Sequence, residues 1–391
     1  MKNGGGQQQQ LSPQQLNALQ RQAVLASAVN MEQGIYSQTV VPANNPVLLV
    51  NPRNVGFIKS FLVLFTLTIK NNDATNALTL TNLGLANTFS NVTFTDLSNN
   101  QRINTAGWHI SFLNTIRHRR SFAAGNAPFT NQMSSYGENF PVIQAPATIA
   151  ASATVTVSGY ISIPLTYSDD DLRGGIYANV VNAVMQLALS FNPQFFVASG
   201  TDSTLAAYKG TANAIIQSAQ VTIYQEYLDQ LPQGAQGVIL PTLDVSTVYD
   251  LKMSQFQNIP TGQDFSVQYA NFRSFLSTFA IFNSNGATDT GRALGGDINY
   301  WSLQAANFTN FWRLDPITLT MKTRGILGLD FPAGCYYTTS RKRPVSTVQY
   351  GNVELNINPK TSTTASYLLV GWESFSLINT LTQAGSLANN G

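Results

Sequence analysis

The chain has 391 residues and a formal net charge of +2, and charged residues make up only 10% of it, against about a quarter in an ordinary soluble domain. This length is enough for two β domains with buried cores, and the small net charge gives no basis for wholesale nucleic-acid binding. Asn, Gln, Ser and Thr replace the missing charge, and burying these groups costs much less than burying ions. The composition favours extensive subunit contacts, with a merely neutral surface as the alternative.

The cysteine count and the N-terminus exclude further classes. The single cysteine, Cys335, rules out an intrachain disulfide framework and a paired-cysteine zinc site, and we interpret it as a small buried side chain. The N-terminus lacks the apolar core of a signal peptide. The longest apolar run, residues 57–69, contains Lys59 and is too short to span a bilayer. We therefore expect a protein that stays in the cytoplasm or leaves it by a route other than secretion.

A helix is predicted after the low-complexity residues 1–10. Ser12 is a suitable N-cap, Pro13 suits the first turn, and Gln15 completes a capping box. A weakly apolar face continues to Gly34, where we expect the helix to end. Such a helix either lies on a membrane or under neighbouring subunits, or packs on its own domain. The candidate residues for membrane or inner-shell contact are Leu16, Leu19, Arg21, Val24 and Leu25.

From residue 36 onward the pattern is almost entirely that of β-strands. Short runs rich in Val, Ile, Thr, Phe and Tyr alternate with turn-forming clusters, and no alternation of strands with helices indicates a parallel nucleotide-binding sheet. Short helices are expected only after Ser168 and at 246–253. The predicted strands include 61–69, 78–80, 92–94, 154–163, 187–191, 221–227, 265–269, 275–282, 353–357 and 367–372.

A weak internal repeat indicates two copies of one β fold. Residues 59–65 resemble residues 273–279, which lie 214 residues later. An Ile163-Pro164 and Asn192-Pro193 pair in the first half matches Phe331-Pro332 and Asn358-Pro359 in the second. A Pro- and Gly-rich stretch between the copies suggests a linker. The expected parts are an arm and helix at 1–35, a first domain with long loops at 36–230, a linker at 231–242 and a second domain at 243–391.

Signals for catalysis are weak. His109 lies in a run, 107–112, that alternates like a strand, so we interpret it as a packed or hydrogen-bonded core histidine. Asp169-Asp170-Asp171 lacks the ligand spacing of a calcium loop, and we interpret it as the first turn of a short helix. No phosphate-binding loop, nucleophile elbow or zinc-protease motif occurs. We therefore predict no catalytic, metal or cofactor site.

One basic cluster is a candidate contact surface. It lies in a solvated loop or at an interface with a neighbouring subunit, and contact with phosphate groups is the alternative. A similar basic run at 341–343 is equally unspecific. The residues of the cluster are Arg117, His118, Arg119 and Arg120.

Many short strings, in chain order, resemble the major coat proteins of tectiviruses, the tailless icosahedral phages that carry an internal membrane. The Gln-rich helical start is similar too, whereas 81–94, 112–144 and 194–220 show less likeness. The strings are Gly107-Trp108-His109 and residues 145–151, 164–168, 227–232, 239–251, 267–271, 297–300, 314–316, 330–332, 349–353 and 358–361.

This resemblance implies an all-β fold with two eight-stranded jelly-roll barrels in tandem and an N-terminal α-helix on the inner side of a shell. It also implies a homotrimer that contacts neighbouring trimers, vertex or minor capsid proteins and the viral membrane, with no cofactor and no specific nucleic acid. The implied location is the virion capsid, assembled in the bacterial cytoplasm.

Two other functions remain open from the sequence. A carbohydrate- or receptor-binding jelly roll, such as a spike or lectin, has the same fold. Trp301, Tyr336 and Tyr337 are the aromatic side chains that could stack on sugars, although packing in a core or loop is the simpler interpretation of them. A glycan-cleaving enzyme is the third possibility, although no carboxylate pair has a recognisable setting.

Overall fold

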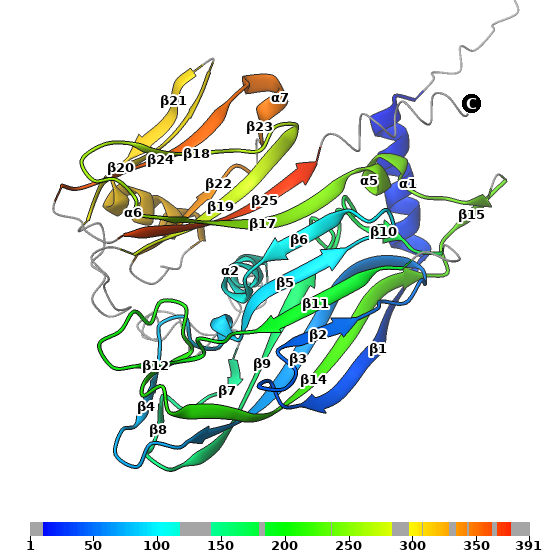
Figure 1. Cartoon of the computed structure of the whole chain (residues 1–391). Coiled ribbons are helices and arrows are strands. Elements are labelled where there is room, and N and C mark those ends of the chain that lie inside the picture. Colours follow the sequence, from blue (N-terminus) through cyan, green and yellow to red (C-terminus); the bar gives the residue numbers. More distant parts are fainter. Residues whose placement is uncertain are drawn as a thin grey trace, which may run out of the picture.

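The computed structural model describes residues 11–117, 142–179, 184–235, 237–283, 297–306, 308–327, 334–341, 344–361 and 366–376. Figure 1 shows two β barrels side by side, with helix α1 (Pro13–Ser27) standing at one end of the molecule. The fold is all-β, a double jelly roll with an N-terminal helix, as the resemblance implied.

The first barrel has two facing sheets of four main strands each. Strand β3 (Phe57–Asn71) alternates buried Phe61, Val63, Phe65 and Leu67 with half-exposed residues, so one face of its sheet lines the core. The first sheet runs β1 (Val29–Val40), β14 (Ala214–Asp229), β3 (Phe57–Asn71), β9 (Thr154–Pro164), then the short β7 (Val142–Gln144); the second runs β2 (Val47–Val50), β11 (Gln186–Phe191), β5 (Phe89–Thr95), β6 (Gln101–Thr105).

The second barrel repeats this order strand for strand. Its two sheets run β17 (Val248–Gln257), β25 (Tyr367–Ser376), β19 (Arg273–Asn283), β22 (Cys335–Thr339), and β18 (Phe265–Gln268), β24 (Val353–Pro359), β20 (Ile298–Ala305), β21 (Phe308–Leu314). Each of the eight strands therefore has a counterpart in the first barrel: β1 and β17, β14 and β25, β3 and β19, β9 and β22, β2 and β18, β11 and β24, β5 and β20, β6 and β21.

The chain also has helices and short strands besides the main strands of the two barrels. The helical ones are η1 (Gly84–Asn87), α2 (Gly107–Arg117), α5 (Thr242–Ser246), α6 (Pro316–Leu327) and α7 (Thr347–Tyr350). The short strands are β4 (Leu78–Leu80), β8 (Thr148–Ile149), β10 (Ile176–Tyr177), β12 (Phe196–Ala198), β13 (Tyr208–Gly210), β15 (Gln233–Gly234), β16 (Gly237–Val238) and β23 (Val345–Ser346). The hairpin of β15 and β16 and helix α5 connect the two barrels.

The two barrels share a sheet. Strand β6 of the first barrel pairs in parallel with β17 of the second, with Ile103 opposite Leu251 and Asn104 opposite Lys252. One sheet therefore continues from the first barrel into the second. Helix α2 fills the angle between them, and every residue from Gly107 to Thr115 is buried. The buried cluster around Trp108 and Phe112 includes side chains from both barrels.

The repeat in the sequence falls in counterpart strands of the two barrels, but it does not follow the register in which those strands pair. Residues 59–65 and 273–279 lie in the counterpart strands β3 and β19, and the two Asn-Pro pairs lie at the ends of β11 and β24. Pro164, the last residue of β9, pairs with Ser60, whereas Thr339, the last residue of the counterpart β22, pairs with Ser277. Thr339 therefore holds the place of Pro164, and the proposed partner Pro332 lies outside the described residues.

Several local predictions were wrong. The N-terminal helix ends at Ser27, and residues 29–34 belong to β1 instead. Residues 107–112 form part of helix α2 and not a strand. Residues 168–170 form bends, and 248–253 lie in β17 instead of a helix. Neither α2 nor α6 was predicted.

Candidate functional site

Helix α1 is fixed to the body of the chain by its polar side. Ser12 accepts a hydrogen bond from the backbone N–H of Gln15, whose side chain accepts one from the Ser12 N–H, so the predicted capping box is present. Nε and Nη2 of Arg21 donate to the two carboxylate oxygens of Asp244, each at 2.6 Å, and Asn17 donates to the same carboxylate at 2.9 Å. Because the Asp244 side chain is 1% exposed, this charge-assisted pair anchors the helix.

The candidate contact residues of α1 lie on two different faces. Arg21 is engaged in its ion pair, and Val24 is fully buried, so these two hold the helix on its own domain. Leu16, Leu19 and Leu25 are 47%, 51% and 37% exposed and are the part of the set that is free for an outside contact. In the part of the chain that the structure describes, no helix combines the length and apolarity needed to cross a bilayer.

A buried cluster of charges lies where the barrels meet. Its centre is Glu373 on β25, whose carboxylate is 0% exposed. Arg341 pairs with it, with Nε 3.1 Å from Oε2, and Nη2 of Arg117, at the end of α2, lies 3.6 Å from Oε1. Tyr249 and Ser277 donate hydroxyl hydrogen bonds to it at 2.7 and 2.6 Å. The carboxylate therefore has partners from both barrels.

The electrostatics of this cluster favour the ionised carboxylate. Burial by itself would raise the pKa of Glu373, but Arg341 and Arg117 outweigh burial, and the pKa lies below its usual value. The same burial raises the pKa of the Tyr249 hydroxyl well above its ordinary value, which keeps that group a hydrogen-bond donor. The cluster is an ion-paired network and not a poised acid or base.

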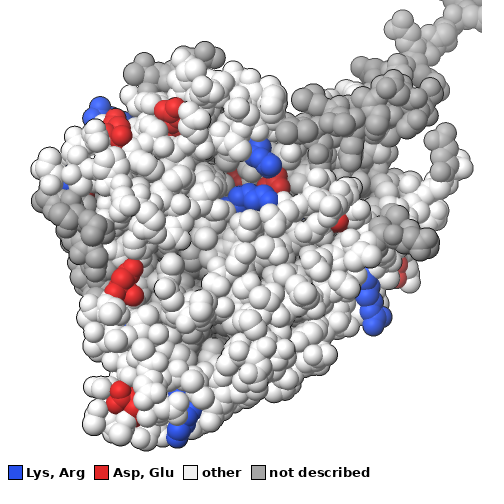
Figure 2. All heavy atoms as spheres, viewed as in Figure 1, with Lys and Arg blue, Asp and Glu red and all other residues white. Residues whose placement is uncertain are grey.

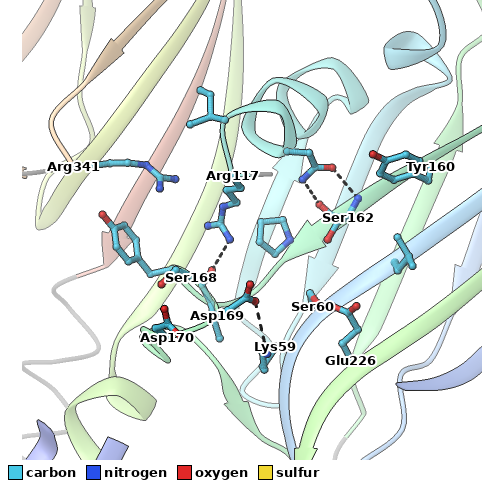
Figure 3. A pocket seen from close by; sticks show the side chains of 16 residues that line it. Lys59, Ser60, Arg117, Tyr160, Ser162, Ser168, Asp169, Asp170, Glu226 and Arg341 are labelled. Atoms are coloured by element: carbon cyan, nitrogen blue, oxygen red, sulfur yellow. Dashed lines mark hydrogen bonds and ion pairs between the residues drawn. The ribbon is translucent and has the colours of Figure 1, made fainter. Parts of the chain in front are cut away.

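A cavity of about 900 Å³ opens beside this cluster, between the two barrels. Figure 3 shows its charged lining: Arg341 reaches in from the second barrel, and Arg117 and Lys59 come from the first. Lys59 lies 3.7 Å from Asp169, and Glu226 accepts a hydrogen bond from Ser60. The three cations thus have carboxylate partners inside the chain, and Glu226 has a hydroxyl donor. The described residues contain no group of His, Cys, Asp and Glu that could hold a metal ion.

The basic cluster is not a single surface. Arg117 is largely buried, and besides Glu373 it donates to Tyr249 Oη at 2.7 Å and to the Thr166 carbonyl at 3.0 Å. Its role is therefore internal, which differs from the exposed contact that the sequence suggested. His118, Arg119 and Arg120 lie outside the described residues, and the contact proposed for them stays a prediction.

His109 is a core residue, as expected, although it lies on a helix. Thr105 Oγ1 lies 2.8 Å from its Nδ1, and burial lowers the pKa of His109 to about 4. Its ring also contacts Phe279 of the second barrel, at 5.4 Å between centroids. Cys335 is buried, as predicted. On the face of the molecule that Figure 2 shows, charged side chains are sparse.

The residues that hold the parts together were not among those predicted from the sequence. Glu373 follows Trp372 in a strand, and nothing in the pattern separates it from a solvent-facing glutamate. Asp244 was not singled out either, because its partners Asn17 and Arg21 are more than 220 residues away. The one signal available for these ion pairs was the small number of acidic residues in the chain, because each buried charge needs a partner of opposite sign.

Comparisons with known proteins agree on one family. The family model for the N-terminal part of the P3 major capsid protein matches residues 6–231, and the model for its C-terminal part matches 246–389. The chain is 41% identical to the major capsid protein P3 of Enterobacteria phage PRD1 over 397 residues, covering 98% of this chain and 99% of that protein.

Solved structures show the same fold at low identity. The major capsid protein of Sulfolobus turreted icosahedral virus has a TM-score of 0.64 at 12% identity, covering 89% of this chain and 97% of that one. The VP54 protein of PBCV-1 has a TM-score of 0.55 at 10% identity, covering 89% and 94%. The matching family models and the relative from phage PRD1 are those of a major capsid protein, which supports the coat function over the sugar-binding alternative and over an enzyme. This chain belongs to the P3 major capsid protein family and is a structural protein of a viral shell.

Proposed function

We propose that three copies of this coat protein form a trimer in which six barrels surround a threefold axis, and that such trimers tile an icosahedral shell around an internal membrane. The observation that carries the proposal is the strand-for-strand repetition of one barrel within the chain. Because three chains then supply six similar units, the trimer has a nearly hexagonal outline, which tiles a surface without large gaps. Closed cyclic oligomers are the usual form of such assemblies.

The surface chemistry supports burial between subunits. Charged residues are 10% of the chain, so large areas can be covered without leaving many unpaired ions. Obligate interfaces of this kind bury roughly 2,000–5,000 Å². Contacts between trimers, and with vertex or minor capsid proteins, are expected to be smaller, so that incorrect contacts can dissociate during assembly in the bacterial cytoplasm.

The membrane contact is proposed for the exposed side of α1. Leu16, Leu19 and Leu25 lie outward while Arg21 holds the helix to Asp244. An apolar helix face of this kind can lie in the headgroup region of a bilayer without crossing it. The net charge of +2 supports no specific role in binding nucleic acid.

Light scattering after size-exclusion chromatography tests the trimer. We expect a mass about three times the chain mass of 42.4 kDa, and electron microscopy of assembled material should show closed particles. A chain that stays monomeric at micromolar concentration contradicts the proposal. A glycan array checks the sugar-binding alternative, which predicts hits and no particles.

A further inference from the structure

A second, smaller cavity lies between the two barrels. Its volume is about 200 Å³, and it shares no lining residue with the charged cavity. Phe89 of β5 and Trp108 of α2 line it from the first barrel, and Met253 of β17 and Leu369 of β25 line it from the second. A molecule held in this cavity therefore contacts both halves of the chain.

The amide side chains in the wall of this cavity are fixed by the chain itself. Asn192, just after β11, donates from Nδ2 to the carbonyl groups of Asn87 at 2.8 Å and Leu205 at 2.6 Å. Its Oδ1 accepts from the backbone N–H of Gln194 at 2.8 Å. Asn87 in turn donates to the Thr204 carbonyl at 3.0 Å. This side of the cavity is therefore preformed.

One polar group of the wall has no partner. Trp108 is 1% exposed, and its Nε1–H has no hydrogen-bond acceptor among the described residues. Leaving a buried donor unpaired costs free energy, and a buried indole N–H usually finds a partner. Trp301 and Trp372 also have an unpartnered Nε1, but neither of them lines this cavity. Trp108 is therefore the donor that a molecule in the cavity can satisfy.

The rest of the lining restricts the size and the charge of that molecule. None of the lining residues is charged, so an ion would enter without a counter-charge and at a high desolvation cost. An apolar cavity of about 150 Å³ is large enough to hold benzene, so this one accommodates a molecule with a single ring. Gln194 and Gln255, which are both exposed, also line the cavity, so it is open to solvent.

We propose that this cavity binds a small neutral carbonyl compound, whose apolar body fills the space between Phe89, Met253 and Leu369 and whose oxygen accepts a hydrogen bond from Trp108 Nε1. This function is additional to that of a coat protein and does not depend on the proposed trimer. Because the bound molecule contacts both barrels of the folded chain, the midpoint of thermal unfolding rises with its concentration.

Two matched probes test the hydrogen bond in the wild-type protein. Acetophenone and α-methylstyrene have nearly the same shape, but the second has a CH₂ group in place of the carbonyl oxygen. We expect acetophenone to bind about three- to tenfold more tightly, which is the contribution of one hydrogen bond. In TROSY spectra of the full-length protein with nitrogen-labelled tryptophan, acetophenone should move the Trp108 Nε1–H signal downfield until it saturates, and the signals of Trp301 and Trp372 should stay in place.

Two tryptophan variants test the assignment to Trp108. Trp108→Phe keeps an aromatic ring and removes the N–H, so it should bind both probes with equal affinity. Trp301→Phe is the matched control: Trp301 is also 1% exposed with an unpartnered Nε1, but it does not line the cavity, and the variant should keep the preference for acetophenone. Circular dichroism confirms that each variant is folded, and the comparison of the two probes on the wild-type protein needs neither variant.

A third variant tests the cavity itself. Ser90 is half-buried and lines the cavity, so the larger side chain of Ser90→Leu occupies part of the space. Both probes should then bind about tenfold more weakly or worse, because a close-packed wall leaves no other room for them. Unchanged binding by this variant would place the probes elsewhere and overturn the proposed site.

The remaining outcomes also decide the proposal. A Trp108 signal that shows no saturable change up to the solubility limit of acetophenone means that the cavity holds only water, and the proposal is then wrong. Equal affinities of the wild-type protein for the two probes exclude the hydrogen bond to Trp108. Neither result affects the proposed trimer, which light scattering tests independently.

Discussion

Arg341 and Glu373 form an ion pair at the junction of the two barrels, and the carboxylate has no exposed surface. Arg117 approaches the same carboxylate from the first barrel. The pair therefore does more than neutralise a buried charge, because it links the end of α2 to the central strand β25. A link of this kind fixes how the barrels are oriented more than it adds net stability.

Removing the carboxylate should be strongly destabilising. Glu373→Ala leaves two guanidinium groups largely buried without their partner, and we expect a loss of about 3–5 kcal/mol in the free energy of unfolding. Urea denaturation measures it. The exposed Glu32→Ala is the control and should change stability by less than about 0.5 kcal/mol. A Glu373→Ala protein as stable as the control would show that the cluster is not structurally important.

His109 should make stability depend on pH. Burial lowers its pKa to about 4, whereas in the unfolded chain it is about 6.5. Between these values the unfolded state binds more protons than the folded state, so stability falls as the pH falls from 6.5 to 4, by about 1.4 kcal/mol per unit from this group alone.

The variant His109→Asn isolates this effect. It should be less stable at pH 7, because packing against Phe279 is lost, but the slope of stability against pH between 6.5 and 4 should be shallower by about the contribution of one proton. Unfolding curves at several pH values give both slopes. Parallel slopes would mean that other groups carry the pH dependence.

Two glycines should respond in opposite ways to alanine. A Cβ at Gly371 would lie 2.7 Å from the His109 ring, so Gly371→Ala forces α2 and β25 apart and should cost about 1–3 kcal/mol. A Cβ at Gly325, in α6, would meet nothing within 4 Å, and Gly325→Ala should stabilise the protein by about 0.5–1 kcal/mol. Thermal unfolding compares the two, and equal shifts would be inconsistent with close packing at the junction.

The exposed leucines of α1 should carry the proposed membrane contact. Leu16→Ser combined with Leu19→Ser should weaken co-sedimentation with phospholipid vesicles at least tenfold while leaving the anchor between Arg21 and Asp244 in place. Ile215→Ser on β14, a residue that is 49% exposed, is the control and should bind as the wild-type chain does. Unchanged binding by the double variant would assign α1 to contacts between proteins.

The sequence predicted the strands better than the helices, for a physical reason. Strands such as β3 and β14 alternate over most of their length, because one face of each sheet lines a core. Helix α2 has no solvent-facing side to mark it as a surface helix, since every residue from Gly107 to Thr115 is buried, and its Gly107–Phe112 segment looked like a strand. The short helices expected near Ser168 and Ser246 rested on local signals that tertiary pairing overrode.

The candidate site was predicted only in part. The capping box and Leu16 and Leu19 follow from local patterns, and the structure agrees with the first and exposes the other two. The ionic partners do not follow, because Arg21 meets Asp244, and Arg117 meets Glu373, only after the chain has folded. No spacing in the sequence encodes contacts over such separations.

The pairing of β6 with β17 has a mechanical consequence. Backbone hydrogen bonds run from one barrel into the next, and α2 is wedged into the angle, so the two halves of a subunit resist bending relative to each other. A shell made of such stiff pieces must take up its curvature at the seams between them, where contacts can tilt without breaking a sheet.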